Sequence, residues 1–80
     1  GIRANAVAPG TILSPRMEAA FTDEQRALNA GNSPMGKMGS TSDIASAALF
    51  FSSDMSAYVT GRTLVVDGGV DSKFPYPVTL

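Results

Sequence analysis

The sequence predicts an α/β fold built on a parallel βαβ unit. Two short apolar segments, residues 2–8 and Thr63–Val66, are typical of strands, and helix-like sequence fills the distance between them. Parallel strands need a long crossover of this kind, and such crossovers are right-handed. Because two strands do not make an independently stable sheet, we expect further strands to come from outside these residues.

Composition bounds the chemistry of the chain. It has 80 residues, no cysteine, no histidine and a net charge of −1, from six basic and seven acidic residues. A chain of this length makes at most one small domain with a marginal core. Without cysteine or histidine we expect no disulfide and no metal site, and the commonest general base is absent. We expect no nucleic-acid partner and no membrane span, because there is no basic patch and no apolar run of ~20 residues. The lack of cysteine slightly favours a cytoplasmic location.

The first predicted strand covers residues 2–8. The chain begins at Gly1, inside this strand and without an initiating methionine, so we expect it to be a piece of a longer protein. Pro9 and Gly10 end the strand, and in open α/β sheets ligands bind at the carboxyl ends of strands. Asn5 would lie within the sheet, where a buried amide needs partners, so we interpret it as a brace for neighbouring backbone rather than a catalytic residue.

Helical sequence follows over residues 16–30. Ser14 suits the cap and Pro15 the first position of this helix. The amphipathic pattern breaks at Thr22, which we expect to cap a second short helix with Arg26 pointing outward.

Two apolar residues of that segment, Met17 and Phe21, are candidates for a substrate lid. Their stripe is equally compatible with simple core packing. The segment directly follows the expected ligand loop, where lids are common, so both interpretations stay open.

Residues 31–39 form a glycine-rich loop that nearly matches the phosphate-binding pattern G-x-x-x-x-G-K. We reject a phosphate site because Met38, which follows Lys37, has no hydroxyl for Mg²⁺. Pro34 also removes a backbone amide that a phosphate cradle would use. The segment is better interpreted as a surface connection.

The clearest helix covers residues 40–52. Ser40 and Asp43 form a variant of the capping box, and Ile44 begins an apolar stripe at helical spacing. Further apolar residues make the helix hydrophobic on more than one side, so it needs burial on two faces. We expect one face to pack on the sheet and the other on another subunit.

The rest of the chain closes the unit. Tyr58 and Val59 are expected to pack inward, and Gly61 to mark the turn into the last strand. Thr63–Val66 is a continuous apolar run of the kind found in parallel strands buried on both faces. Residues 70–80 form a short tail.

Several blocks at this order and spacing resemble the C-terminal part of a short-chain dehydrogenase/reductase. They are IRANAVAPG, then MGKMGSTSDIASAALFFSSDMSAYVTG, then TLVVDGG. The resemblance implies a Rossmann-type doubly wound parallel sheet, of which this chain supplies the last two strands and their covering helices. It makes residues 1–69 the C-terminal part of a single NAD(P)-binding domain, and residues 70–80 a C-terminal tail.

The same resemblance assigns roles around the first strand's end. Pro9 and Gly10 would shape the turn beside the nicotinamide of NAD or NADP. Ile12 would offer backbone groups to the carboxamide, and Ser14 would give its hydroxyl to the carboxamide or the diphosphate. The family more often has threonine at this last position, and serine lacks the methyl group that restricts the rotamer.

No catalytic residue is expected in the chain. The family's glycine-rich phosphate loop, its catalytic serine and its Tyr-x-x-x-Lys pair would all lie upstream of Gly1. Tyr58 and Arg62 repeat the spacing of that pair, but they match the family's later Y-V-T-G turn. Arginine also cannot tune a tyrosine as lysine does.

We therefore expect part of an NAD(P)-dependent oxidoreductase that moves a hydride between nicotinamide and a carbonyl or secondary alcohol. The chain alone should be inactive. Its partners would be the N-terminal part of the same protein, a small carbonyl or alcohol substrate, and further copies in a homodimer or homotetramer. The helix from Ser42 to Ser52 and the strand Thr63–Val66 would form that oligomer surface. The alternative is a non-catalytic fragment or degenerate relative that acts as an assembly or binding module.

Overall fold

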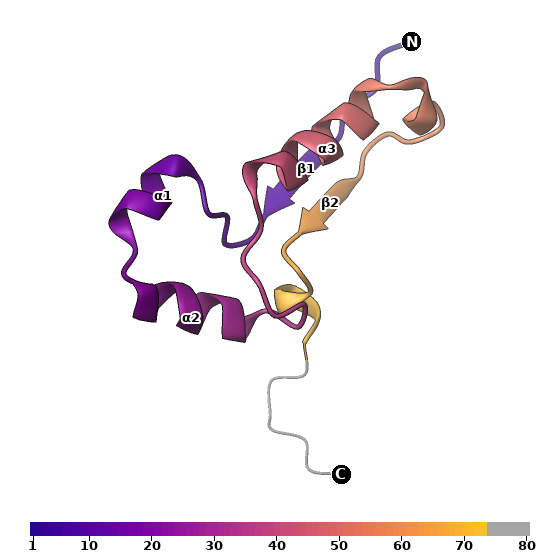
Figure 1. Ribbon diagram of the computed structural model, residues 1–80. Helices are drawn as coiled ribbons and strands as arrows, with labels where there is room; N and C mark the ends of the chain where they lie inside the picture. Colours follow the sequence, from indigo (N-terminus) through magenta and orange to yellow (C-terminus); the bar gives the residue numbers. More distant parts are fainter. Residues whose placement is uncertain (74–80) are drawn as a thin grey trace.

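A computed structural model describes residues 1–73 and contains a two-stranded parallel sheet (Figure 1). Strand β1 (Ala6–Pro9) pairs with strand β2 (Thr63–Val66) along its whole length. The predicted parallel βαβ unit is therefore confirmed. The elements between and after the strands are α1 (Pro15–Ala20), α2 (Asp23–Asn32), α3 (Thr41–Ser52) and the 3₁₀ turns η1 (Asp54–Ser56) and η2 (Val70–Ser72).

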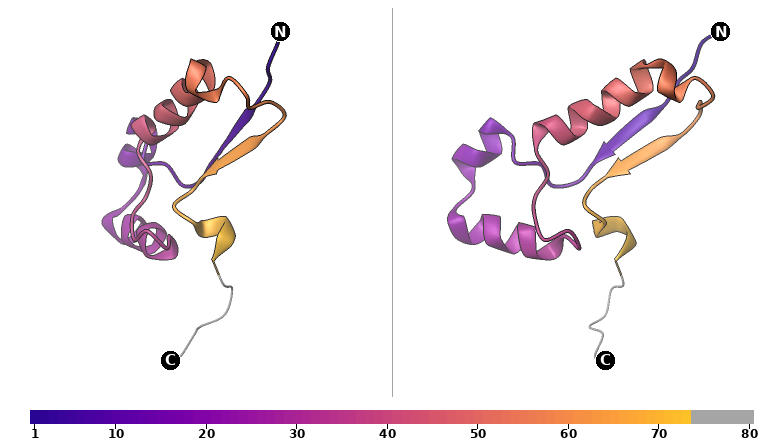
Figure 2. Two further views of the ribbon diagram at one scale, coloured as in Figure 1. Left: turned by 90° about the vertical axis from the view of Figure 1, so that its right-hand side faces the viewer. Right: turned by 45° about the vertical axis from the view of Figure 1, so that its right-hand side comes forward.

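Helix α3 lies along one face of the two strands and contacts both of them (Figure 2). The buried apolar side chain among residues 1–73 is that of Ala47, in the middle of α3, with 7% of its surface exposed. A small residue at this position lets the helix approach the sheet closely. The expectation that one face of this helix packs on the sheet is confirmed. Helices α1 and α2 extend away from the strands (Figure 1).

The first strand begins later than the sequence predicts, at Ala6 rather than at residue 2. The preceding residues run beside the turn before β2 and bond to it irregularly: Ala4 N–H donates to Thr60 Oγ1 at 3.1 Å, and Gly61 N–H donates to the Ala4 carbonyl at 2.8 Å. A regular ladder cannot form against a turn, so the strand starts only where β2 does.

Asn5 braces this turn, as the sequence predicts. Its Nδ2 donates to the Val59 carbonyl at 3.0 Å, and its Oδ1 accepts from the Arg62 N–H at 3.1 Å. The half-buried amide therefore satisfies two backbone groups that have no strand partner.

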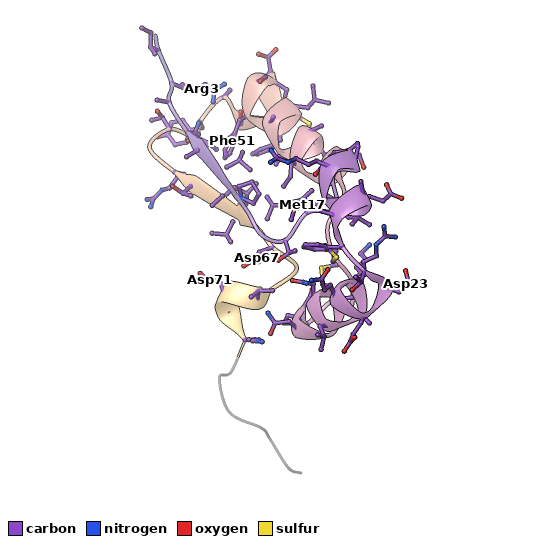
Figure 3. All side chains as sticks on the ribbon, turned by 90° about the vertical axis from the view of Figure 1, so that its left-hand side faces the viewer. Arg3, Met17, Asp23, Phe51, Asp67 and Asp71 are labelled. Atoms are coloured by element: carbon purple, nitrogen blue, oxygen red, sulfur yellow. The ribbon has the colours of Figure 1, made fainter. Side chains whose placement is uncertain are left out.

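Arg3 makes a second brace beside it. One guanidinium nitrogen donates to the Ser56 carbonyl at 2.8 Å and to the Val59 carbonyl at 3.0 Å, and the other donates to the Phe51 carbonyl at 3.2 Å. These carbonyls come from the C-terminal turn of α3, from η1 and from the turn that follows η1. The N-terminal segment is thus tied to the end of α3 by side chains rather than by strand pairing (Figure 3).

The predicted helix caps are present. Ser14 Oγ accepts from the Met17 N–H at 3.3 Å, and Pro15 occupies the first turn of α1. Thr22 begins α2 and forms a reciprocal capping box with Gln25.

The α3 cap also matches the prediction, because Ser40 and Asp43 form a reciprocal capping box. The outward orientation predicted for Arg26 is wrong. This side chain is half-buried and donates to the Glu18 carbonyl in α1. The last carbonyls of a helix have no intrahelical donor, so a nearby guanidinium bonds to them.

Two burial predictions differ from the structure. Strand β2 was expected to be buried on both faces, but Leu64 and Val65 are 40% and 45% exposed, because one strand and one helix cover it in this chain. Tyr58 was expected to pack inward and is fully exposed, on the turn after η1. Val59 is half-buried.

The predicted tail begins with η2, and residues 74–80 of it lie outside the described residues. Over residues 1–73, no helix has the length and apolar character needed to cross a membrane. The same residues contain no group of three potential metal-ligating side chains.

Candidate cofactor groove

The candidate site lies where both strands end. Gly10 follows β1 directly, and its N–H donates to the Val66 carbonyl at 2.9 Å, which extends the pairing by one residue. Asp67 follows β2 and holds its own turn, because its carboxylate oxygens accept from the Gly69 N–H at 2.9 Å and the Asp71 N–H at 2.8 Å. Figure 3 shows Asp67 at the opposite end of the strands from Arg3. The carboxyl edge of the sheet is thus made of two closely apposed turns.

A third segment joins this edge at Gly39. The Gly39 N–H donates to the Thr11 carbonyl at 3.0 Å, and the Leu13 N–H donates to the Gly39 carbonyl at 2.8 Å. These two bonds form an isolated parallel bridge between Ile12 and Gly39. The chain therefore leaves the sheet edge after Ile12 and returns to the same place at Gly39. Helices α1 and α2 lie in the segment between these two residues.

An open groove of about 650 Å³ runs over this edge. It brings together four of the residues singled out in the sequence: Pro9, Gly10, Ile12 and Met17. Ser14 and Phe21 do not line it. Ser14 is the cap of α1, and Phe21 is the residue that ends α1. The remaining lining residues are Thr11, Thr41 and Ile44.

The segment from Ile12 to Ser14 offers polar groups suited to an amide. Within residues 1–73 the Ile12 N–H has no hydrogen-bond acceptor, whereas the Ile12 carbonyl accepts from the Ser14 N–H at 3.0 Å. Ser14 Oγ accepts one bond at the cap, which leaves its hydroxyl hydrogen free to donate elsewhere. A backbone donor at Ile12 and a hydroxyl donor at Ser14 fit a carboxamide oxygen or a phosphate oxygen.

A second cavity, of about 220 Å³, shares Thr11 and Ile12 with the groove as lining residues. Lys37 and Asp43 stand at this cavity with the side chains of Met35 and Met38. The charge of Lys37 contributes to the electrostatics of the α3 cap.

The pKa of the Asp43 carboxyl is lowered from its ordinary value of 3.8. The main cause is the hydrogen bond from the Ser40 N–H, at 2.8 Å, followed by the bond from the Ser40 hydroxyl, at 3.0 Å. The positive charge of Lys37 also lowers this pKa, more weakly, whereas desolvation raises it. The start of α3 is thus stabilised by an ionised carboxylate.

Sequence reasoning missed three residues of the groove, Thr11, Thr41 and Ile44, and it missed Gly39, which bridges to Ile12 and lines the second cavity. Thr11 and Thr41 were given no role, Ile44 was interpreted only as core, and Gly39 was assigned to a surface loop. The sequence gives little indication of the role of Gly39, because a glycine before a serine cap is common. No nearby residue in the sequence indicates that Ile12 lies against it. The pairing of these residues depends on how the segment that carries α1 and α2 returns to the sheet.

Known proteins are similar to this chain in sequence and in fold. The family model described as enoyl-(acyl carrier protein) reductase matches residues 1–71. The chain is 48% identical to 3beta-hydroxysteroid dehydrogenase 1 of Eggerthella lenta and 45% identical to L-rhamnose 1-dehydrogenase (NAD(P)(+)) of a Sphingomonas species, each over 71 residues. These matches cover 88% of this chain but only 27% and 28% of the two enzymes, so the chain spans little more than a quarter of their length.

A solved structure gives the same result for the fold. The short-chain dehydrogenase/reductase of Brucella melitensis described as glucose/ribitol dehydrogenase superposes with a TM-score of 0.75 and 34% identity. The superposition covers 85% of this chain and 27% of that one. The chain belongs to the short-chain dehydrogenase/reductase family.

Proposed function

We propose that this chain is the C-terminal part of a longer NAD(P)-dependent oxidoreductase, whose N-terminal part supplies the rest of the sheet and the catalytic residues. The observation that carries the proposal is the groove at the carboxyl ends of β1 and β2, which is lined in part by Ile12, a residue whose N–H has no acceptor within residues 1–73. Ligands of open α/β folds bind at this edge of the sheet. The exposure of Leu64 and Val65 supports a missing neighbour for β2.

In this proposal the groove holds the nicotinamide end of NAD or NADP. Pro9 and Gly10 shape the turn, and Ile12 and Ser14 hold the carboxamide or diphosphate by hydrogen bonds. When bound, the cofactor supplies or accepts a hydride. The chain's own residues fix the orientation of the nicotinamide ring and exclude water from one side of it.

The substrate would be a small molecule with a carbonyl or secondary alcohol. The names of the relatives support this class, since hydroxysteroids and rhamnose both carry such groups. Met17 lines the groove, and Phe21 ends the same helix, so α1 is placed to act as part of a lid over an apolar substrate. The cofactor preference between NAD and NADP would be set outside residues 1–80.

A second part of the proposal concerns assembly. Helix α3 packs on the sheet through Ala47, yet Leu49 on the same helix is 71% exposed. Together with the exposed face of β2, this helix would form the contact between copies in a homodimer or homotetramer. Apolar side chains of this size, gathered on one helix and one strand, are typical of subunit interfaces.

A chimera tests the proposal. Residues 1–71 replace the aligned region of the Eggerthella lenta enzyme, and hydride transfer from a 3β-hydroxysteroid to NAD or NADP is measured. The unaltered Eggerthella lenta enzyme is the positive control. The 80-residue chain alone is the negative control. Cofactor-dependent turnover by the chimera, and none by the chain alone, is the expected result. A chimera that does not fold, or turnover by the chain alone, contradicts the placement. A folded, assembled chimera without cofactor binding favours the alternative of a non-catalytic assembly module.

A further inference from the structure

We propose that Gly39 is a positioning residue for the cofactor, acting through Ile12. This inference rests on the proposed function, because it assumes that the Ile12 backbone holds the nicotinamide end. Gly39 lies outside β1, β2 and the Pro9–Gly10 turn, and it bridges to Ile12 after the segment that carries α1 and α2.

The hydrogen bonds of Gly39 fix the direction of the free donor. Gly39 N–H donates to the Thr11 carbonyl at 3.0 Å, and that carbonyl belongs to the same peptide group as the Ile12 N–H. A trans peptide is planar, with its C=O and N–H on opposite sides. Because the carbonyl points to Gly39, the Ile12 N–H must point away from it. The next peptide is also held, since the Leu13 N–H donates to the Gly39 carbonyl at 2.8 Å.

Because residue 39 has no side chain, the Ile12 side chain has room to adopt its observed position. A Cβ atom at this position would lie 2.6 Å from Ile12 Cδ1, which is closer than carbon atoms can approach. The terminal methyl of Ile12 can rotate away, so an alanine here need not unfold the protein. It would move Ile12 toward one of the two cavities that this residue lines, at about 650 Å³ and 220 Å³.

The experiment uses the full-length oxidoreductase that carries this chain, with dissociation constants for NAD(H) and NADP(H) and the thermal midpoint as readouts. We expect Gly39→Ala to weaken cofactor binding about three- to tenfold, because returning Ile12 to its binding position against the new methyl costs as much as an off-rotamer side chain. In the free protein Ile12 can relax away, so the thermal midpoint should change little. Replacing Ile12 by valine removes Cδ1, so the double variant Gly39→Ala/Ile12→Val should recover most of the affinity that Gly39→Ala loses.

Two controls separate this effect from a general loss of stability. Gly31, in α2, would carry a Cβ with no atom within 4 Å, so Gly31→Ala should leave cofactor affinity unchanged. Ile12→Val alone sets the reference for the double variant. Unchanged affinity in Gly39→Ala overturns the inference, as does a double variant that binds the cofactor no better than Gly39→Ala does. If the unaltered protein binds neither cofactor, the proposed function itself fails, and this inference fails with it.

Discussion

The backbone of Gly10 lies directly against Asp67. A Cβ atom on residue 10 would stand 2.6 Å from Asp67 Cβ and 2.7 Å from Asp67 Cα. Asp67 cannot move aside easily, because its carboxylate holds the Gly69 and Asp71 amides. Its backbone also continues directly from β2. The two strand-end turns can therefore meet only if residue 10 is glycine.

Gly10→Ala should destabilise the full-length enzyme and weaken NAD(P) binding. Overpacking against backbone that cannot relax costs about 1–3 kcal/mol of unfolding free energy. Thermal or urea denaturation measures the first effect and cofactor titration the second. Gly31→Ala is the matched control, because the new methyl meets open space in a helix, where alanine is favoured over glycine by about 1 kcal/mol. Equal behaviour of the two variants would show that the Gly10–Asp67 contact is not restrictive.

Ser14 carries two separable roles, a helix cap and a proposed cofactor donor. Aspartate keeps the acceptor that caps α1 but removes the hydroxyl donor and adds a negative charge. Ser14→Asp should therefore keep the thermal midpoint within a few degrees and raise the KM for NAD(P) about tenfold or more. Ser14→Thr keeps both groups and should bind the cofactor as well as serine does or better, because its rotamer is more restricted. Steady-state kinetics at varied cofactor concentration measure the KM for NAD(P) of each variant. An unchanged KM in Ser14→Asp argues against the cofactor role of Ser14.

Asn5 should affect stability rather than chemistry. Asn5→Ala leaves the Arg62 amide without its partner and the Val59 carbonyl with only the bond from Arg3, which costs about 1–3 kcal/mol of unfolding free energy. Denaturation of the full-length enzyme measures this loss, and kcat at a temperature well below the transition should stay near the unaltered value. A large drop in kcat without loss of stability would instead assign Asn5 to the reaction.

The Asp43 cap predicts a response to acid. Its folded pKa lies below 3.8, so the ionised carboxylate stabilises α3 at higher pH, and this contribution is lost as pH falls through the lowered folded pKa. Asp43→Asn keeps an acceptor for the Ser40 amide but cannot titrate. Below pH 3.8 the stability of the unaltered protein should fall toward that of Asp43→Asn, and near neutrality it should be higher. Parallel pH–denaturation curves for the two proteins would contradict the cap's electrostatic contribution.

Leu49 tests the proposed assembly surface. Leu49→Glu places a charge on the exposed side of α3 and should shift the full-length enzyme to a smaller species in sedimentation or light-scattering measurements. The control is Leu28→Glu, since Leu28 has a similar exposure, 68% against 71%, but lies on α2, outside the proposed surface. An unchanged mass for Leu49→Glu, or the same dissociation for both variants, would remove α3 from the interface.

The sequence by itself determined the local features of this protein. The caps at Ser14, Thr22 and Ser40 follow from side chains that satisfy the first amides of a helix within three residues. The second strand, Thr63–Val66, follows from a run of apolar and β-branched residues bounded by turn residues. The bracing role of Asn5 follows from the cost of an unpaired amide in a sheet.

Only the tertiary structure decided which distant residues meet. The contact of Gly10 with Asp67 and the bridge of Ile12 with Gly39 join segments that local pattern treats as separate loops. The exposure of Tyr58 and the inward turn of Arg26 were mispredicted for the same reason. Helix caps and hydrophobic periodicity depend on residues that are close in the sequence. Contacts between loops depend instead on how the whole segment between β1 and β2 folds and where it returns to the sheet. The sequence thus located the strand-end turn at Pro9 and Gly10, and the fold brought Gly39 against Ile12 beside it.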